Sequence, residues 1–124
     1  MTSSHVHLSD EAVDADTQVV RAHGDFDLYV APEFKRRLAT TIEAGKTRIV
    51  VDLTDAAFMD STALAVLIGA LKRLRVRGGA LVVASEQPTI LRILELTGMD
   101  QVLDLYATTG EALAGLYRSA EAKA

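Results

Sequence analysis

Apolar residues recur every three or four positions in four segments of the chain, which is the spacing of helices with one buried face. In residues 31–45, Phe34, Leu38 and Ile42 share such a face, and Pro32 suits the first turn. A second helix is predicted between Ser61 and Gly78, with inward residues Leu64, Leu67, Ile68, Leu71 and Leu74. A third is predicted over 87–98, with Ile90, Leu94 and, as a weaker candidate, Thr97 facing inward. A fourth is predicted over 109–124, with Thr109 as its cap and with inward residues Leu113, Leu116 and Tyr117.

Short apolar or β-branched runs between these helices predict strands. Two come before the first helix: residues 5–8, and residues 17–27, which are expected to end near Gly24. The acidic stretch 11–17 between them reads as a turn. Three more are predicted over 48–53, 80–85 and 102–106. The order ββαβαβαβα is typical of an α/β domain with helices packed on a mixed, mostly parallel sheet, whose opening strands form an antiparallel hairpin.

Length and composition narrow the class of protein. A chain of 124 residues suits a single domain over 1–124, in which we expect the first few residues and roughly 119–124 to be flexible. The net charge of −4 argues against a nucleic-acid partner, because phosphate contacts need a basic face. The absence of cysteine excludes disulfides and thiolate catalysis and fits the cytoplasm. No secretion signal is visible, and the longest apolar run, Ala63–Leu71, is far shorter than the roughly 20 residues that membrane insertion needs.

The case for an enzyme is weak. No catalytic motif is present, and Ser61 has no evident base because the histidines lie in the first two strands. His5 and His7 have a spacing that could bind a metal, but solvent-facing positions on an edge strand are the better interpretation, since no second ligand cluster is visible. His23, beside Gly24, reads as a histidine at a strand end. We therefore expect no catalytic residue, no metal and no cofactor.

Two further polar clusters have plain structural explanations. Arg73, Arg75 and Arg77 lie near the end of a predicted helix, where cations are favoured and solvated, so a phosphate-binding patch is the weaker interpretation. In the stretch GDFD, Asp25 and Asp27 are placed to make a turn and enter a helix through side-chain bonds to backbone amides. The alternative for these two aspartates is an acidic rim around a site.

The stretch MDST leaves two interpretations open. Asp60 and Ser61 precede a strong helix, as N-cap residues do. The same place is also where α/β domains bind anions, because free amides and the helix dipole point there. A phosphate on a hydroxyl there would be tolerated by the fold. It would repel a partner, because Asp60, Asp25 and Asp27 would add to its negative charge.

The motifs of the chain resemble those of STAS domains, and specifically of bacterial anti-sigma factor antagonists. The family pattern is a strand and a short loop followed by F-[ML]-D-S-[ST]-G-L into a long helix. Residues 58–64 correspond to that last motif. The stretch GDFD is similar to the family's G-E-L-D, and residues 96–106 are similar to its L-x-x-x-G-L segment. The resemblance covers nearly the whole chain in the family's order, and implies a single STAS domain.

The resemblance implies a function and a set of site residues. Members of the family bind an anti-sigma factor that is also a serine kinase, and so free a sigma factor. The kinase, which carries the ATP and Mg²⁺, phosphorylates the serine after the loop aspartate, and a serine phosphatase resets the cycle. In this chain that serine is Ser61, with Thr62 a lesser candidate. The expected loop and partner-binding residues are Asp25, Asp27, Asp60, Thr62 and Ala63.

The chain departs from the family pattern at three positions. Ala63 replaces the usual glycine and predicts a tighter loop, since alanine favours helix. Asp25 replaces glutamate, and Phe26 replaces leucine. Two other functions stay open. One is a STAS module in another assembly, either a stressosome scaffold or the cytoplasmic partner of a lipid-transport ABC system. The other is a small enzyme or nucleotide-binding protein. We expect the free protein to be a monomer.

Overall fold

The computed structural model describes residues 6–26 and 29–123. The elements are β1 (Val6–Ala12), β2 (Thr17–Phe26), α1 (Ala31–Glu43), β3 (Arg48–Met59), α2 (Ser61–Val76), β4 (Ala80–Ala84), α3 (Pro88–Leu96), the 3₁₀ helix η1 (Met99–Gln101), β5 (Asp104–Tyr106) and α4 (Thr109–Lys123). The predicted order ββαβαβαβα is confirmed, with η1 as an unexpected addition.

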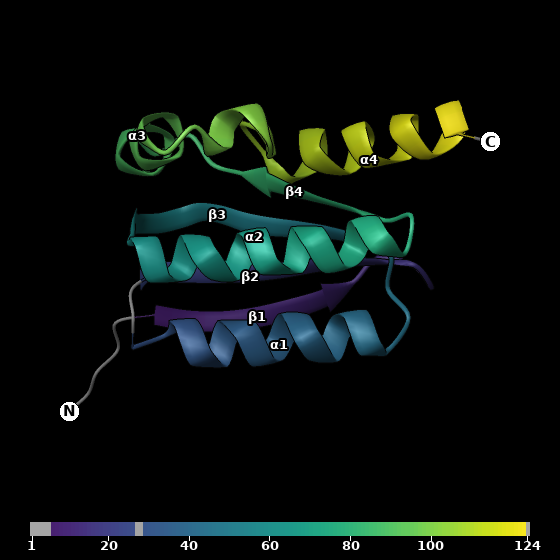
Figure 1. Ribbon diagram of the computed structural model, residues 1–124, viewed down its shortest axis with the longest axis horizontal. Coiled ribbons are helices and arrows are strands. Elements are labelled where there is room, and N and C mark those ends of the chain that lie inside the picture. Colours follow the sequence, from purple (N-terminus) through teal and green to yellow (C-terminus); the bar gives the residue numbers. More distant parts are fainter. Residues whose placement is uncertain (1–5, 27–28, 124) are drawn as a thin grey trace.

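The strands of the described residues form one five-stranded sheet in the order β1-β2-β3-β4-β5. The opening pair is antiparallel, from Val6 opposite Gly24 to Ala12 opposite Gln18. The other three pairings are parallel, which confirms the predicted mixed sheet. Successive parallel strands are added in one direction and joined by crossovers of one hand, so the crossover helices share a face. In Figure 1, α1 and α2 accordingly run beside each other in front of the sheet.

Alternate residues of the strands build two apolar clusters on the two faces of the sheet. On one face Val20, Ile49, Val51 and Val83 pack with inward residues of α1, α2 and α3, among them Phe34, Leu38, Leu67 and Leu94. On the other face Val19, Val50 and Val82 pack with Ala112 and Leu116 of α4. The central strands are thus covered on both sides, which is why their sequence is continuously apolar.

Three strand boundaries differ from the prediction. The stretch 11–17 is not all turn, because β1 continues to Ala12 as a charged edge strand paired with β2. The third strand does not end at Leu53 but runs to Met59, because β2 keeps pairing with it. The second runs past Gly24 to Phe26; Gly24 lies at a break in register with φ 89°, a conformation that glycine adopts easily.

Smaller corrections concern the helices and the last strand. Ile90 and Leu94 are buried as expected, but Thr97 is exposed and lies at the C-cap of α3. The cap of α4 is Thr108 and not Thr109, since the Thr108 hydroxyl accepts a hydrogen bond from the amide of Glu111 at 3.1 Å. β5 begins at Asp104 and not at Val102, because the amides of Val102 and Leu103 both donate to the carbonyl of Met99 in η1.

Candidate functional site

A single residue, Asp60, joins the end of β3 to the start of α2. Its backbone is extended (φ −97°, ψ 178°), and its side-chain Oδ1 accepts a hydrogen bond from the amide of Ala63 at 3.0 Å. Its carbonyl accepts the first bond of the helix, from the amide of Leu64 at 3.1 Å. The capping interpretation of Asp60 is therefore confirmed, and the connection is shorter than the loop expected from the family pattern.

The next three residues form the first turn of α2. The side chains of Ser61 and Thr62 are exposed, whereas Ala63 is fully buried beneath them. Within the described part of the chain, the Ser61 hydroxyl makes no hydrogen bond. It stands at the positive end of a helix of 16 residues. The hydroxyls of Ser61 and Thr62 are thus accessible, while Ala63 serves the helix start through its amide.

The GDFD and MDST stretches meet at the same end of the sheet. Asp25 pairs with Phe58 and Phe26 pairs with Met59 in the parallel register of β2 and β3. Asp25 is exposed and belongs to the strand, not to the connection before α1. Asp25 thus lies on the strand beside the one that leads into Asp60, whereas Asp27 lies outside the described residues, so the acidic rim stays a prediction.

Phe58 is a surface residue of this site that sequence reasoning assigned only to a motif. Its side chain is 45% exposed, beside Asp25 and two residues before Asp60. Met59, the next residue, is buried, as strand alternation requires. Exposed aromatic rings such as this one are enriched in protein interfaces.

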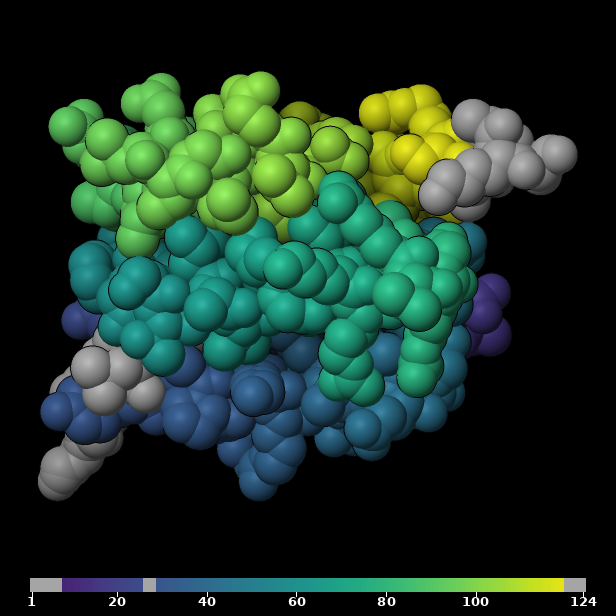
Figure 2. Space-filling model, in the orientation of Figure 1, coloured from purple at the N-terminus to yellow at the C-terminus, as the bar shows by residue number. Residues whose placement is uncertain are grey.

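A shallow groove of about 450 Å³ begins at Ser61 and follows α2. Its walls are Leu64, Ile68 and Lys72 on one side and Thr97 and Met99 on the other. In Figure 2, α2 crosses the middle of this face, with the segment 88–101 above it and α1 below it. Thr97 and Met99 are distant from Ser61 in the sequence and only the fold brings them together, so no local motif could have identified this groove.

The basic residues of α2 hold neighbouring segments together. The guanidinium of Arg77 donates to the carbonyl of Ile42 at 2.8 Å, and that of Arg75 donates to the carbonyl of Val102 at 3.2 Å. Arg73 lies 3.8 Å from Glu43. These contacts confirm a structural role for Arg75 and Arg77 at the C-terminal end of the helix, where the negative end of the helix dipole favours cations.

One of the three histidines, His23, has a described side chain. His23 lies within β2, with its Nδ1 3.4 Å from the carboxylate of Asp55. His5 and the side chain of His7 lie outside the described residues. Among the residues described, no group of three or more histidine or acidic side chains is placed to hold a metal ion. In the same part of the chain, no helix is both long and apolar enough to cross a membrane.

Asp52 is a buried carboxylate that the strand prediction passed over. Its oxygens accept hydrogen bonds from Arg21 Nε at 3.1 Å and from the amide and hydroxyl of Thr54 at 3.0 and 2.7 Å. Burial raises the pKa of Asp52, but bonds from Thr54 and Thr109 and the charge of Arg21 outweigh it and hold that pKa below its usual value. Asp52 thus ties β2 and β3 to the start of α4, away from Ser61.

Comparisons with known proteins agree on one family. A family model described as the STAS domain matches residues 11–112. The anti-sigma-B factor antagonist of Listeria monocytogenes is 34% identical over 88 residues, which cover 71% of this chain and 77% of that protein. The Bacillus subtilis anti-sigma-B factor antagonist is 31% identical, with 71% and 80% covered. A crystal structure of an anti-sigma factor antagonist from Mycobacterium paratuberculosis has a TM-score of 0.83 at 25% identity, with 90% and 94% covered.

Proposed function

The chain belongs to the STAS domain family, and we propose that it is an anti-sigma factor antagonist whose binding is switched off by phosphorylation of Ser61. The observation that carries the proposal is the exposed Ser61 hydroxyl at the first position of α2, directly after the capping Asp60. Its partners would be an anti-sigma factor that is a serine kinase and binds the ATP and Mg²⁺, and a serine phosphatase. The protein would be cytoplasmic, and it would be a monomer when it is not bound to a partner.

The place of Ser61 supports a modification that spares the fold. A phosphate adds about −1.5 to −2 charge at neutral pH. Negative charge at a helix N-terminus stabilises the helix by roughly 0.3–1 kcal/mol, which offsets its repulsion by Asp60. The Ser61 side chain is exposed, so no packed group has to move. Phosphorylation would therefore leave the free energy of unfolding nearly unchanged.

The surroundings of Ser61 support a strong effect on a partner. The partner would cover the rim formed by Asp25, Phe58, Asp60 and Thr62 and the groove along α2. Like charges a few ångströms apart cost on the order of 1 kcal/mol in water, and more when an interface excludes water. About 1.4 kcal/mol already lowers affinity tenfold. A phosphate beside Asp60 and Asp25 would thus release the partner.

Phosphorylation is tested by incubating the protein with its anti-sigma factor kinase, ATP and Mg²⁺, followed by mass spectrometry of peptides. We expect one phosphate on Ser61 and none in Ser61→Ala. Thr62→Ala should be modified like the unaltered protein. Phosphate found only at other residues would overturn the assignment of Ser61.

The switch itself is tested by the affinity of Ser61→Asp for the anti-sigma factor. We expect at least a tenfold weaker Kd, with no change in the thermal transition. Ser119→Asp is the matched control, because Ser119 is exposed on α4, far along the chain from this site. Equal affinities of Ser61→Asp and Ser119→Asp would contradict the proposal. Recovery of an ABC transporter instead of an anti-sigma factor in a pull-down would favour the alternative assembly.

A further inference from the structure

A second groove, larger than the one at Ser61, runs between α1 and α2. Its volume is about 550 Å³, which lies within the range of small-molecule sites. It extends from Ala31 and Thr62 at one end to Ile42 and Arg73 at the other, a length of about 16 Å along the helices. Leu38 and Ala70 form part of its floor and are almost fully buried, so the floor is apolar.

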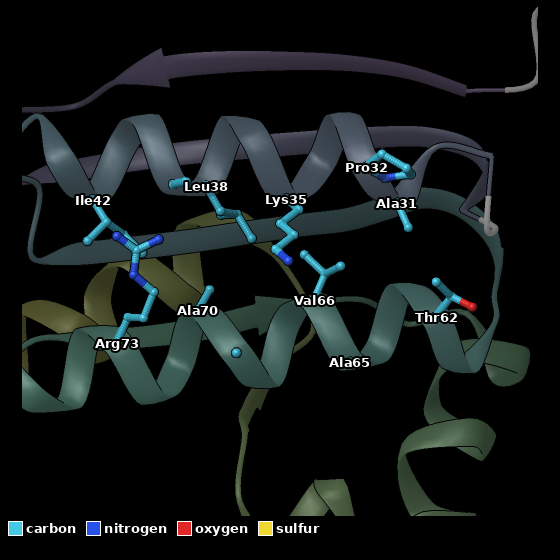
Figure 3. A pocket seen from close by; sticks show the side chains of 12 residues that line it. Ala31, Pro32, Lys35, Leu38, Ile42, Thr62, Ala65, Val66, Ala70 and Arg73 are labelled. Atoms are coloured by element: carbon cyan, nitrogen blue, oxygen red, sulfur yellow. The ribbon is translucent and has the colours of Figure 1, made fainter.

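Two cations stand over this apolar floor from opposite walls. Figure 3 shows the Lys35 side chain reaching from α1 towards Val66 of α2, and the Arg73 side chain reaching from α2 towards Ile42 of α1. Arg73 has Glu43 at 3.8 Å, whereas Lys35 has no ion pair or hydrogen bond among the described residues. A positive charge beside apolar surface is complementary to a ligand with one anionic end and an apolar body.

We propose that this groove binds an aliphatic carboxylate, a fatty acid or a close analogue. Its carboxylate would pair with Lys35, and its chain would lie on the floor towards Ile42. An unbranched alkyl chain needs no hydrogen-bond partner, whereas a peptide backbone laid in this groove would lose those of its amides. The site is distinct from the proposed switch because it does not use the Ser61 hydroxyl, although Ala65 and Gly69 line both grooves.

The test is a titration of the isolated, ¹⁵N-labelled protein with sodium dodecanoate below its micelle concentration. We expect saturable binding in the micromolar range, with amide shifts at Val66, Gly69 and Ala70 and none in α4. Dodecyltrimethylammonium, which has the same chain and a positive head, should bind at least tenfold more weakly. Equal binding of the two amphiphiles, or shifts confined to other surfaces, would overturn the proposal.

Two pairs of variants locate the site. A Cβ added at Gly69 meets nothing within 4 Å, so a larger side chain has room to start there, and Gly69→Leu should fill part of the groove and abolish binding. Gly110→Leu is the matched control, since a Cβ there meets only the Thr108 hydroxyl at 4.0 Å, and it should bind normally. Lys35→Gln should weaken binding about tenfold, as loss of a charged hydrogen bond does. Arg92→Gln, on exposed α3, should not.

The proposal fails if Gly69→Leu binds dodecanoate like the unaltered protein while its circular dichroism and thermal transition are normal. It also fails if dodecanoate gives no shifts and an acidic amphipathic peptide shifts the same amides, because the groove would then belong to a protein partner. Neither result bears on Ser61, since no kinase or anti-sigma factor is present in the titration. The two proposals can therefore fail separately.

Discussion

The Tyr117 hydroxyl donates a hydrogen bond of 2.5 Å to the Asp14 carboxylate, joining residues that are 103 positions apart. Asp14 lies in the turn between β1 and β2, and Tyr117 lies on α4. The guanidinium carbon of Arg48 stands 5.3 Å from the centre of the same ring. This bond is the largest of the several causes that together lower the pKa of Asp14 to about 2. It also raises the pKa of Tyr117. It fastens the hairpin turn to the last helix.

The first prediction follows from the lowered pKa of Asp14. Because its folded pKa of about 2 is below the ordinary value of 3.8, its contribution to stability is present above pH 4 and is lost as the pH falls towards 2. Tyr117→Phe keeps the ring under Arg48 and removes the hydroxyl, so it should lose less stability over that range. Urea unfolding at pH 7, 4 and 2.5 measures the difference. The control is Asp16→Asn in the same turn, and a Tyr117→Phe profile parallel to that of the unaltered protein would contradict the prediction.

The second prediction separates the cap of α2 from its charge. Asp60→Ala removes the acceptor of the Ala63 amide and should lower the free energy of unfolding by about 1 kcal/mol. Asp60→Asn keeps an acceptor and should lower it by only a few tenths, although it removes the negative charge. Both values come from urea denaturation at neutral pH. Equal losses in the two variants would mean that the charge, and not the cap, stabilises the helix.

The third prediction concerns two adjacent glycines after α2, at which different structural requirements favour glycine. Gly78 has φ +74°, whereas Gly79 is needed because a Cβ there would lie 2.2 Å from the carbonyl oxygen of Thr47. Gly79→Ala should therefore destabilise the protein by about 1–3 kcal/mol, the usual cost of forcing atoms into packed space. Gly69→Ala is the control and should stabilise by about 0.5–1 kcal/mol, since its site is open and helical. A neutral Gly79→Ala variant would refute this explanation.

The sequence predicted the element order and the apolar faces because both follow from local periodicity. It placed the end of β3 too early because residues 54–59 have no strong apolar alternation and include residues that disfavour strands. That half of the strand exists because β2 pairs with it, through a break in register at Gly24. A pairing between segments so far apart is a tertiary effect, and no local pattern reports it.

In the candidate site, too, some features follow from local sequence and others only from the tertiary structure. The cap by Asp60 depends on residues 60–63 alone and was predictable. The adjacency of Asp25 and Phe58 depends on the register of two strands, and the groove at Ser61 depends on where η1 packs. Sequence reasoning could therefore name the serine through a resemblance, but it could not describe the surface around it.

The last prediction tests the buried carboxylate of Asp52, whose partners come from three elements. Asp52→Asn keeps an oxygen for Thr54 but places an uncharged amide beside the guanidinium of Arg21. Loss of a hydrogen bond between charged groups costs about 1.5–3 kcal/mol, so the free energy of unfolding should fall by about that amount at pH 7. The difference should shrink as the pH falls below about 4, because the lowered pKa of Asp52 means that its contribution is lost in acid.

Asp55→Asn is the control for this variant, since it makes the same chemical change three residues along β3. The Asp55 side chain is 70% exposed and meets only His23 at 3.4 Å among the described residues, so its loss should cost less than about 0.5 kcal/mol. Urea denaturation of both variants at pH 7 and pH 2.5 gives the comparison. If Asp52→Asn and Asp55→Asn unfold alike, the bonds of Asp52 stabilise the fold no better than a surface ion pair would, and α4 is retained by other contacts, among them the apolar ones of Ala112 and Leu116 and the bond of Tyr117 to Asp14.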